Sequence, residues 1–434
     1  MASDTDIAYA SAATLLDRYR NKTLSPVQVT RFVLDRLDAL QGKLNAFSIV
    51  DREGALAAAR ASERRWHAGA PLGLIDGVPV TIKDLALMRG FPTLRGSLMV
   101  ARDQDWSEDA PATARLREAG AVLLGKTTSP EFGWKAIGDS PLTGITRNPW
   151  NTNHTPGGSS AGAAVACAAG IGPLHQGSDG AGSIRIPAAF TGVFGFKPTF
   201  GRVPAYPLSP TGSLSHTGPI TRTVEDAALM LSVIAMPDDR DPYALPPDPR
   251  DWREGLEEGV AGWKIAYSPA LGYAEVMPQI AAAVAAAARQ FAALGASVEQ
   301  VDSVFPSPRD ALFTIWTAAM ARNLAPYPPE KRALADPGLL ADAAAGEKIL
   351  ATELIAADQA RNALSHSMAR LHRQYDLLLT PMMPILALPV GQDLNDPAKE
   401  RHWIDWSPFS YPFNMTRQPA ASIPCGLTQS GLPI

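Results

Sequence analysis

The sequence predicts an α/β fold, in which helices cover both faces of a β-sheet. Two observations support this prediction. Short runs rich in β-branched residues, such as "GVPVTIKD" (77–84) and "TGVFGFKP" (191–198), have the composition of buried strands. These runs alternate along the chain with segments of helical periodicity, which is typical of a sheet covered on both faces. The chain has 434 residues, enough for a large hydrophobic core.

The first 70 residues are expected to be helical. The segment 24–40 repeats apolar residues at three- and four-residue spacing, and Ser25 followed by Pro26 is typical of a helix start. Residues 52–68 predict a second, more polar helix. Downstream, the expected order is strand 77–84, helix 110–120, strand 121–127, helix 159–170 and strand 191–198.

The second half of the chain begins with a proline- and charge-rich stretch, 236–251, which we expect to be a surface crossover. A strand, a helix and a strand then follow and form a βαβ unit, which we expect to continue the same sheet. Their ranges are 262–269, 278–295 and 296–302. Residues 306–375 are expected to be mostly helical with a proline break at 326–332, and further strands are expected at 375–384 and 420–426.

Composition excludes several classes of protein. Charged residues are 19% of the chain, the net charge is −4, and no basic run is present, so nucleic acid is not an expected partner. The two cysteines, Cys167 and Cys425, cannot form a disulfide framework and fit a reducing cytoplasm. We expect no signal peptide and no membrane span. The histidines and cysteines show no HExxH, HxxxH or CxxC spacing, so neither a metal site nor a cofactor is expected.

Two glycine-containing motifs each allow more than one interpretation. In "TPGGSSAG" (155–162), Ser160 fits the G-x-S-x-G nucleophile elbow, but turn-forming residues precede it where an elbow needs a strand. A glycine–serine turn that caps a helix is the alternative. Residues 120–127 match the phosphate-binding pattern G-x-x-x-x-G-K-[ST]. Their apolar interior favours a buried strand that ends at Lys126, and nucleotide binding remains the alternative.

A second serine lies in a small-residue loop. In "QGSDGAGSIRIPAAFTG" (176–192), Gly180, Ala181 and Gly182 directly precede Ser183. Such a loop can turn its N–H groups inward, where they could stabilise an oxyanion. Asp179 and Arg185 flank the loop and could pin it with a charge-assisted bond. The alternative is a structural glycine loop without a catalytic role.

Lys83 ends an apolar, strand-like run and precedes Asp84. A lysine buried at such a position would have a lowered pKa and could act as a base. Asp84 would oppose that shift if it pointed at the amine, so we expect it to face away. The alternative is a lysine that extends from the end of the strand into water.

Together these stretches resemble the amidase signature family. The likeness extends from about residue 10 to the end and is strongest over 73–230. There, "GVPVTIKD", "GKTTSPEFG", "TRNPWN", "GGSSAGAA", "GSDGAGSIRIPAAFTG" and "GPITRTVEDAALML" occur in the family order, and the spacing of 24 from Ser159 to Ser183 agrees with the family pattern.

The resemblance implies a central, mixed and twisted sheet covered on both faces by helices, in one domain over 1–434. Its expected parts are N-terminal helices at 1–70, a catalytic core at 71–235, a more variable and mostly helical region at 236–375, and the C-terminal part of the core at 376–434. That last part is expected to lack the closing strand and helix of the family.

The resemblance also implies a catalytic set. Lys83 is the expected base, Ser159 the bridging serine, which follows a cis peptide bond in the family, and Ser183 the nucleophile that forms an acyl-enzyme. Ser160 is expected to support the loop. The implied oxyanion hole comprises the N–H groups of Gly180, Ala181, Gly182 and Ser183. Ala161 and Ala181 stand where the family more often has glycine, and His175 stands in place of a small residue.

Aromatic residues suggest the substrate class. Phe132, Trp134 and Ile137 are expected to line one side of the cleft, Phe313 and Trp316 another, and Trp406 to close it. The predicted substrates are small-molecule amides, with aryl amides, carbamates and esters preferred, and the enzyme is expected to act as a monomer or homodimer. An amidotransferase component that releases ammonia from glutamine is the alternative within the family.

Overall fold

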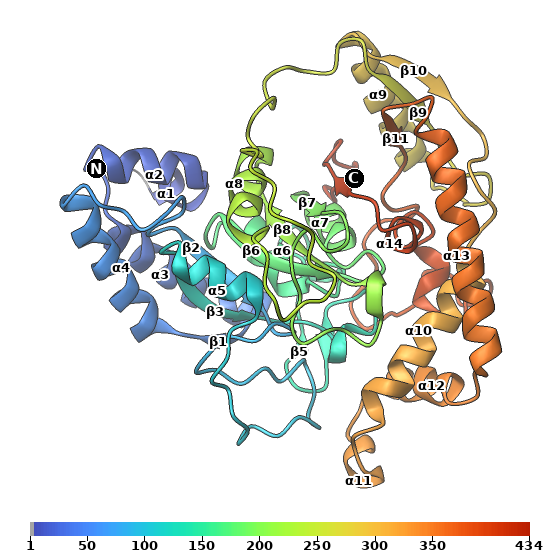
Figure 1. Ribbon diagram of the computed structural model, residues 1–434, viewed down its shortest axis with the longest axis horizontal. Coiled ribbons are helices and arrows are strands. Elements are labelled where there is room, and N and C mark those ends of the chain that lie inside the picture. The colour runs from blue at the N-terminus through green and yellow to red at the C-terminus, as the bar shows by residue number, and fades with distance from the viewer. Residues whose placement is uncertain (1–3) are drawn as a thin grey trace.

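The structure is a computed structural model that describes residues 4–434. Its central element is a mixed seven-stranded sheet (Figure 1). Its strand order is β1 (Phe47–Val50), β3 (Val122–Thr127), β2 (Pro79–Lys83), β6 (Leu174–Asp179), β8 (His216–Thr221), β7 (Phe194–Lys197) and β12 (Ala420–Ser422). Strands β3, β2 and β6 are parallel to one another, and every other pair of neighbours is antiparallel. The prediction of a mixed α/β sheet is confirmed.

Helices cover both faces of this sheet. Helices α6 (Ala161–Ala168) and α7 (Arg185–Thr191) pack on one face, and α5 (Pro111–Glu118) and α8 (Val224–Ile234) lie on the other. The N-terminal helices pack beside the β1–β3 end of the sheet, at the left of Figure 1. They are α1 (Asp4–Ala8), α2 (Ala12–Arg20), α3 (Pro26–Leu44) and α4 (Arg52–His67).

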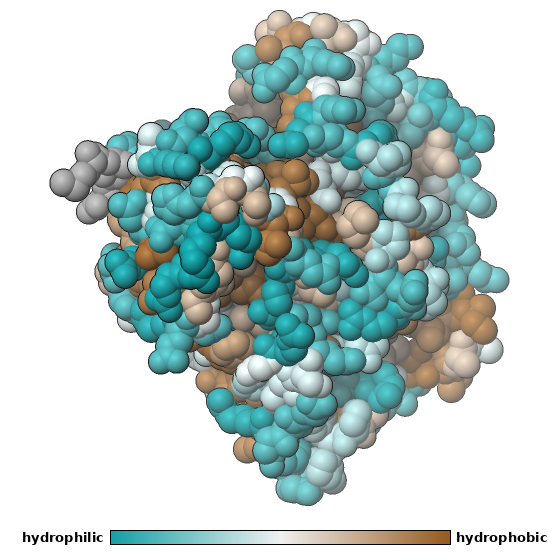
Figure 2. Space-filling model, turned by 60° about the vertical axis from the view of Figure 1, so that its left-hand side comes forward, coloured by the Kyte–Doolittle hydropathy of each residue, from teal (hydrophilic) through white to brown (hydrophobic). Residues whose placement is uncertain are grey.

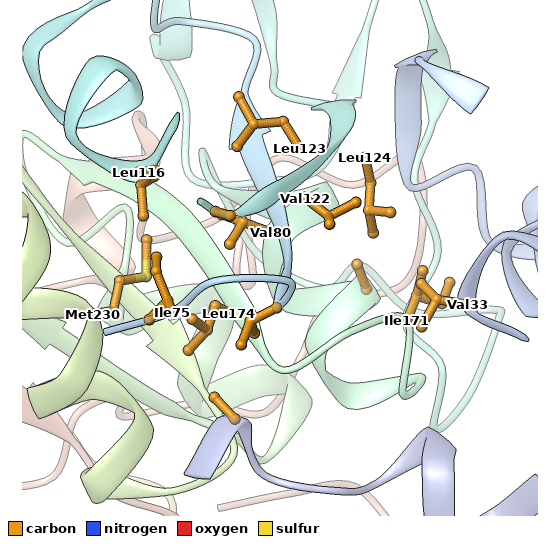
Figure 3. Packing of buried hydrophobic residues seen from close by; sticks show 14 of the residues in the cluster. Val33, Ile75, Val80, Leu116, Val122, Leu123, Leu124, Ile171, Leu174 and Met230 are labelled. Atoms are coloured by element: carbon orange, nitrogen blue, oxygen red, sulfur yellow. The ribbon is translucent and has the colours of Figure 1, made fainter. Parts of the chain in front are cut away.

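Figure 3 shows part of the hydrophobic core around β2 and β3. Val80 of β2 and Leu174 of β6 are fully buried, and they share one cluster with Leu116 of α5, Met230 of α8 and Val33 of α3. Every residue of β2 and β3 is buried, because both faces of these strands are covered. Burial of each such aliphatic side chain stabilises the fold by about 2 kcal/mol.

Helix α3 begins where the sequence predicts, at Ser25 and Pro26. Ser25 is the N-cap, and its Oγ accepts a hydrogen bond from the Gln28 N–H at 3.1 Å. The Gln28 Oε1 in turn accepts from the Ser25 N–H at 2.9 Å, which completes a capping box. Pro26 occupies the first helical position, where no N–H is needed.

The predicted βαβ unit exists, but it does not extend the central sheet, so that expectation was wrong. Strands β9 (Lys264–Tyr267), β10 (Ser297–Gln300) and β11 (Leu377–Leu379) form a separate parallel sheet in the order β10-β9-β11. Helix α9 (Pro278–Ala293) connects β9 to β10. The physical reason is that β9 pairs with β10 on one side and with β11 on the other, so it has no free edge to offer the central sheet.

The mostly helical region lies at the right of Figure 1. Helix α10 (Arg309–Leu324) packs against α12 (Pro337–Gly346) and α13 (Ala351–Leu371). The predicted proline break separates α10 from the short α11 (Pro329–Arg332). The 3₁₀ helix η3 (Trp403–Trp406) also contacts α10, and α14 (Pro412–Met415) follows it. The shorter elements are η1 (Glu131–Gly133), β4 (Asp139–Ser140), β5 (Gly144–Ile145) and η2 (Gly212–Leu214).

The surface is mixed in character. Figure 2 shows one face, on which hydrophilic residues predominate and hydrophobic residues gather in small groups. Within residues 4–434, none of the helices combines the length and the apolar character that a membrane crossing requires.

Candidate active site

Lys83 lies at the end of β2 and is completely buried, so the alternative of a lysine that reaches water is wrong. Its Nζ lies 2.8 Å from the Ser159 Oγ, 2.9 Å from the Ser160 Oγ and 3.0 Å from the Ser178 Oγ. Its backbone N–H donates to the Gln176 Oε1 at 2.9 Å. The lysine amine is therefore enclosed by three serine hydroxyls.

Burial lowers the pKa of Lys83 to about 7, because the charged ammonium loses its hydration, and the negative charge of Asp179 opposes this effect. Asp84 does face away from Lys83, as expected. Its carboxylate lies 3.0 Å from the Nζ of Lys126. The amine is thus spared the neighbouring carboxylate that would raise its pKa.

The motif at 155–162 runs directly into α6. The Gly158–Ser159 peptide bond is cis, as the family resemblance implies. A Cβ on Gly158 would lie 2.6 Å from the carbonyl oxygen of Ile137, so only glycine fits there. The Ser160 hydroxyl donates to the Ser178 carbonyl at 3.1 Å, and no strand directly precedes it. The elbow interpretation of Ser160 therefore lacks its structural context.

Ser183 lies on the loop between β6 and α7. Its carbonyl accepts a hydrogen bond from the Ser160 N–H at 3.0 Å, which joins the two serine loops. Among the described residues, no hydrogen bond links the Ser183 hydroxyl to Ser159 or to any other group. The structure therefore brings the loops of Ser159 and Ser183 together and leaves the Ser183 hydroxyl free.

Asp179 organises the Ser183 loop. Its Oδ1 accepts from the Gly182 N–H at 2.6 Å, and its Oδ2 accepts from the Ile184 N–H at 3.2 Å. Arg185 donates to both carboxylate oxygens of Asp179, at 2.9 and 3.1 Å. Burial alone would raise the pKa of the Asp179 carboxyl, but the charge and hydrogen bonds of the fully buried Arg185 hold that pKa far below its usual value. The expected pinning of the loop is present.

The N–H groups of the loop are not equivalent. The Gly182 N–H is occupied by Asp179, so its assignment to the oxyanion hole needs correction. Among the described residues, the N–H groups of Gly180, Ala181 and Ser183 have no acceptor. Ala181 does not have a positive φ, so an alanine is accommodated where the family more often has glycine.

Two residues far along the chain complete this loop. Arg185 donates to the Ser410 carbonyl at 2.9 Å and to the Asn414 Oδ1 at 2.6 Å. The Ser410 hydroxyl donates to the Ala181 carbonyl at 2.7 Å, and the Asn414 amide donates to Asp179 at 2.8 Å. No local pattern marks Ser410 or Asn414 in the sequence. Ser178 was also missed, although strand alternation places it on the same face as Gln176.

A cleft of about 440 Å³ opens over Lys83 and Ser178. Of the six side chains predicted to line it, only Phe132 does so. Trp134, Ile137, Trp316 and Trp406 are buried in the packed core, and Phe313 packs edge-on against His402 instead. The cleft walls come from elsewhere, namely from Leu85, Ala86 and Arg95, from residues 204–210, and from Arg322, Asn323, Pro326 and Tyr327.

Most of the segment 120–127 belongs to β3 (Val122–Thr127), which is buried along its whole length, and Lys126 donates to the Thr93 hydroxyl at 2.5 Å. A phosphate-binding loop requires backbone N–H groups that open toward a ligand, and this strand uses its backbone in the sheet. The strand interpretation is confirmed.

Comparison with known proteins agrees with this geometry. The family model "Amidase" matches residues 28–434. The chain is 35% identical over 439 residues to an acylamidase of Rhodococcus erythropolis, with 100% of this chain and 92% of the relative covered. It is 36% identical over 439 residues to a glutamyl-tRNA(Gln) amidotransferase subunit of Myxococcus xanthus, covering 94% and 89%. The solved structure of a bacterial aryl acylamidase superposes with a TM-score of 0.92 at 32% identity, covering 98% and 91%.

The fold and these matches define an enzyme that hydrolyses the C–N bond of amides. The chain belongs to the amidase signature family.

Proposed function

We propose that this enzyme cleaves amides through an acyl-enzyme on Ser183, with Lys83 as the base and Ser159 as the proton relay. One observation carries the proposal. Lys83 is fully buried with its pKa lowered to about 7, and its amine lies 2.8 Å from the Ser159 hydroxyl. A lysine in this state can accept a proton near neutral pH.

Hydrogen bonding supports Ser159, rather than Ser160, as the relay. A neutral amine has two N–H donors and one lone pair. The Ser160 proton is directed to the Ser178 carbonyl, so Ser160 can only accept from Lys83. The Ser159 hydroxyl has no other acceptor among the described residues, and it can therefore donate to the lysine lone pair.

The proposed reaction has two steps. As the Ser183 oxygen bonds to the amide carbonyl carbon, its proton passes to Ser159, and the Ser159 proton passes to Lys83. The N–H groups of Gly180, Ala181 and Ser183 stabilise the oxyanion, each by about 3 kcal/mol. The proton returns to the leaving nitrogen as the C–N bond breaks, and water then cleaves the acyl-enzyme by the same route.

The preferred substrates are aryl amides, and carbamates and esters present the same carbonyl chemistry. Support comes from the tilted aromatic pair Phe132–Tyr327, whose ring centroids are 5.9 Å apart at the cleft. The names of two relatives, an acylamidase and an aryl acylamidase, agree with this class. We further propose that the enzyme acts in the cytoplasm as a monomer or homodimer.

The second candidate is a component of an amidotransferase, which the similarity to the Myxococcus xanthus protein supports. Such a component would release ammonia from glutamine in the presence of partner chains. Hydrolysis of aryl amides by the isolated chain favours the first candidate. Glutaminase activity that appears only after a partner is added favours the second.

Covalent labelling tests the assignment of the nucleophile. A serine-directed fluorophosphonate is expected to modify Ser183, as shown by peptide mapping, and Ser183→Ala should remove both the label and the activity. Ser160→Ala is the matched control and should still be labelled at Ser183. A label found on Ser160 in the unsubstituted enzyme would refute the proposal.

A further inference from the structure

The cleft above Lys83 has an unusual charge balance. Arg95 and Arg322 line it together with Lys83, whereas no aspartate or glutamate does. Neither guanidinium forms an ion pair or a side-chain hydrogen bond with a described residue. Arg322 is exposed, but Arg95 is half-buried, where an unpaired charge loses part of its hydration without compensation. An anionic ligand would supply that compensation.

The backbone holds Arg95 in place. Arg95 has a φ of +56°, in the left-handed region that is rare for residues other than glycine. Its carbonyl accepts from the Phe132 N–H at 2.7 Å, and Phe132 also has a positive φ, of +51°. Two residues with uncommon backbone conformations are thus bonded to each other, and both line the cleft. Such conformations concentrate where ligands are bound.

We propose that Arg95 binds a carboxylate carried by the amide substrate, while Phe132 and Tyr327 hold the apolar part beside it. This inference rests on the proposed function and names the substrate class more closely. A planar guanidinium can bond both oxygens of a carboxylate, which fixes orientation as well as charge. Arg322, at the exposed rim, attracts the same anion over a longer range.

The proposed carboxylate site must also be compatible with a neutral Lys83. A carboxylate next to Lys83 would raise the pKa of the lysine and oppose its function. Burial and Asp179 govern the pKa of Lys83, whereas the charge of Arg95 acts on the pKa values of Lys126 and Tyr327. An anion paired with the Arg95 guanidinium has its charge offset there, which limits its effect on the pKa of the lysine.

Pairs of aryl amides that differ in one carboxylate test the proposal. On the acyl side, succinyl-4-nitroanilide is compared with butanoyl-4-nitroanilide, and on the amine side, 4-butyramidobenzoate is compared with butyranilide. In at least one pair, kcat/KM should favour the charged compound by about tenfold or more. In Arg95→Asn, the ratio of kcat/KM for the charged compound to kcat/KM for the uncharged one should fall to about one, mainly through a higher KM for the charged compound. Asparagine tolerates the positive φ at this position.

Arg102→Asn is the matched control, because it removes an exposed arginine from the same segment outside the cleft, and it should leave the ratio unchanged. Calorimetric binding of the same four compounds to Ser183→Ala gives a readout that needs no turnover, and the same preference is expected there. Equal or weaker binding of the charged compound in both pairs would overturn the inference, as would a preference that survives in Arg95→Asn. The proposed function fails separately, through absence of hydrolysis and of Ser183 labelling.

Discussion

Lys83 is surrounded by oxygen atoms, but its amine is expected to work in the uncharged form. Four oxygens lie within 3.3 Å of the Nζ, and three of them belong to hydroxyl groups that can either donate or accept. Hydroxyl groups can therefore satisfy the amine in both protonation states. Burial decides between the states, because no carboxylate is hydrogen-bonded to the amine to stabilise the ammonium.

The pH dependence of activity follows from this environment. Lys83 must be neutral to accept a proton, and its folded-state pKa is lowered to about 7, so kcat/KM should rise with pH through about 7 and then level off. Steady-state kinetics between about pH 5.5 and 9 measure this profile. Lys83→Arg, whose side chain stays protonated, should be inactive at every pH. A profile that falls across this range would exclude the lysine as the base.

The Asp179–Arg185 pair predicts a large stability effect. Asp179→Ala leaves the fully buried Arg185 without its carboxylate, which should cost about 3–5 kcal/mol in the free energy of unfolding. Urea denaturation measures this cost. Glu275→Ala removes a carboxylate from an exposed pair with Lys399 and should change stability little. Equal losses in the two variants would show that burial does not set the cost.

At the scale of secondary-structure elements, the N-terminus of α3 gives a clean test. Ser25→Ala removes the cap of the Gln28 N–H and should lower the free energy of unfolding by about 1 kcal/mol. Ser25→Gly should lower the free energy of unfolding by only a few tenths of a kcal/mol, since glycine leaves the helix end accessible to water. Thermal or urea unfolding of the two variants measures the difference. A larger loss in the glycine variant would contradict the capping explanation.

Elements were predictable from the sequence where local pattern decides them. The strand β2 and the helix α3 follow from apolar periodicity and from Ser25–Pro26. The sheet to which β9 and β10 belong did not follow, because the second partner of β9 is β11, a strand more than one hundred residues later. Local sequence carries no information about that competition.

The candidate site shows the same division. Lys83, Ser159 and Ser183 lie in distinctive motifs, and the structure places their loops together. Ser410 and Asn414 come from an ordinary segment near the end of the chain, and their contacts exist only in the folded molecule. The prediction of which aromatic residues line the cleft was mostly wrong, because a large aromatic residue near a motif packs into a core as readily as it lines a cleft.

At the scale of the whole molecule, the cleft is assembled from distant parts of the chain. The central sheet supplies Lys83, residues 204–210 form one wall, and Arg322 to Tyr327, around the end of α10, form another. Catalytic and substrate-binding groups thus belong to different parts of the structure. Substitutions on the α10 side can therefore change substrate preference without touching the lysine and its three serines.

Two buried histidines make the stability of the folded molecule depend on pH. His175 accepts from the Thr81 hydroxyl at 2.9 Å and donates to the Gly172 carbonyl at 3.1 Å, so it is satisfied as a neutral ring. Burial, aided by the charge of Arg222, lowers its pKa to about 3, and burial likewise lowers that of His216 to about 3. In the unfolded chain both rings take up a proton below about pH 6.5.

Between about pH 6.5 and 3, the unfolded state therefore binds more protons than the folded state, and the stability must fall as the pH falls. From about pH 6.5 to 5, each histidine should remove about 2 kcal/mol from the free energy of unfolding. His175→Gln should flatten this slope in urea denaturation measured at several pH values, whereas His366→Gln, at an exposed position on α13, should not. If His175→Gln left the slope unchanged, the ring would have to be protonated inside the fold, and the bond from Thr81 to its Nδ1 would have to reverse.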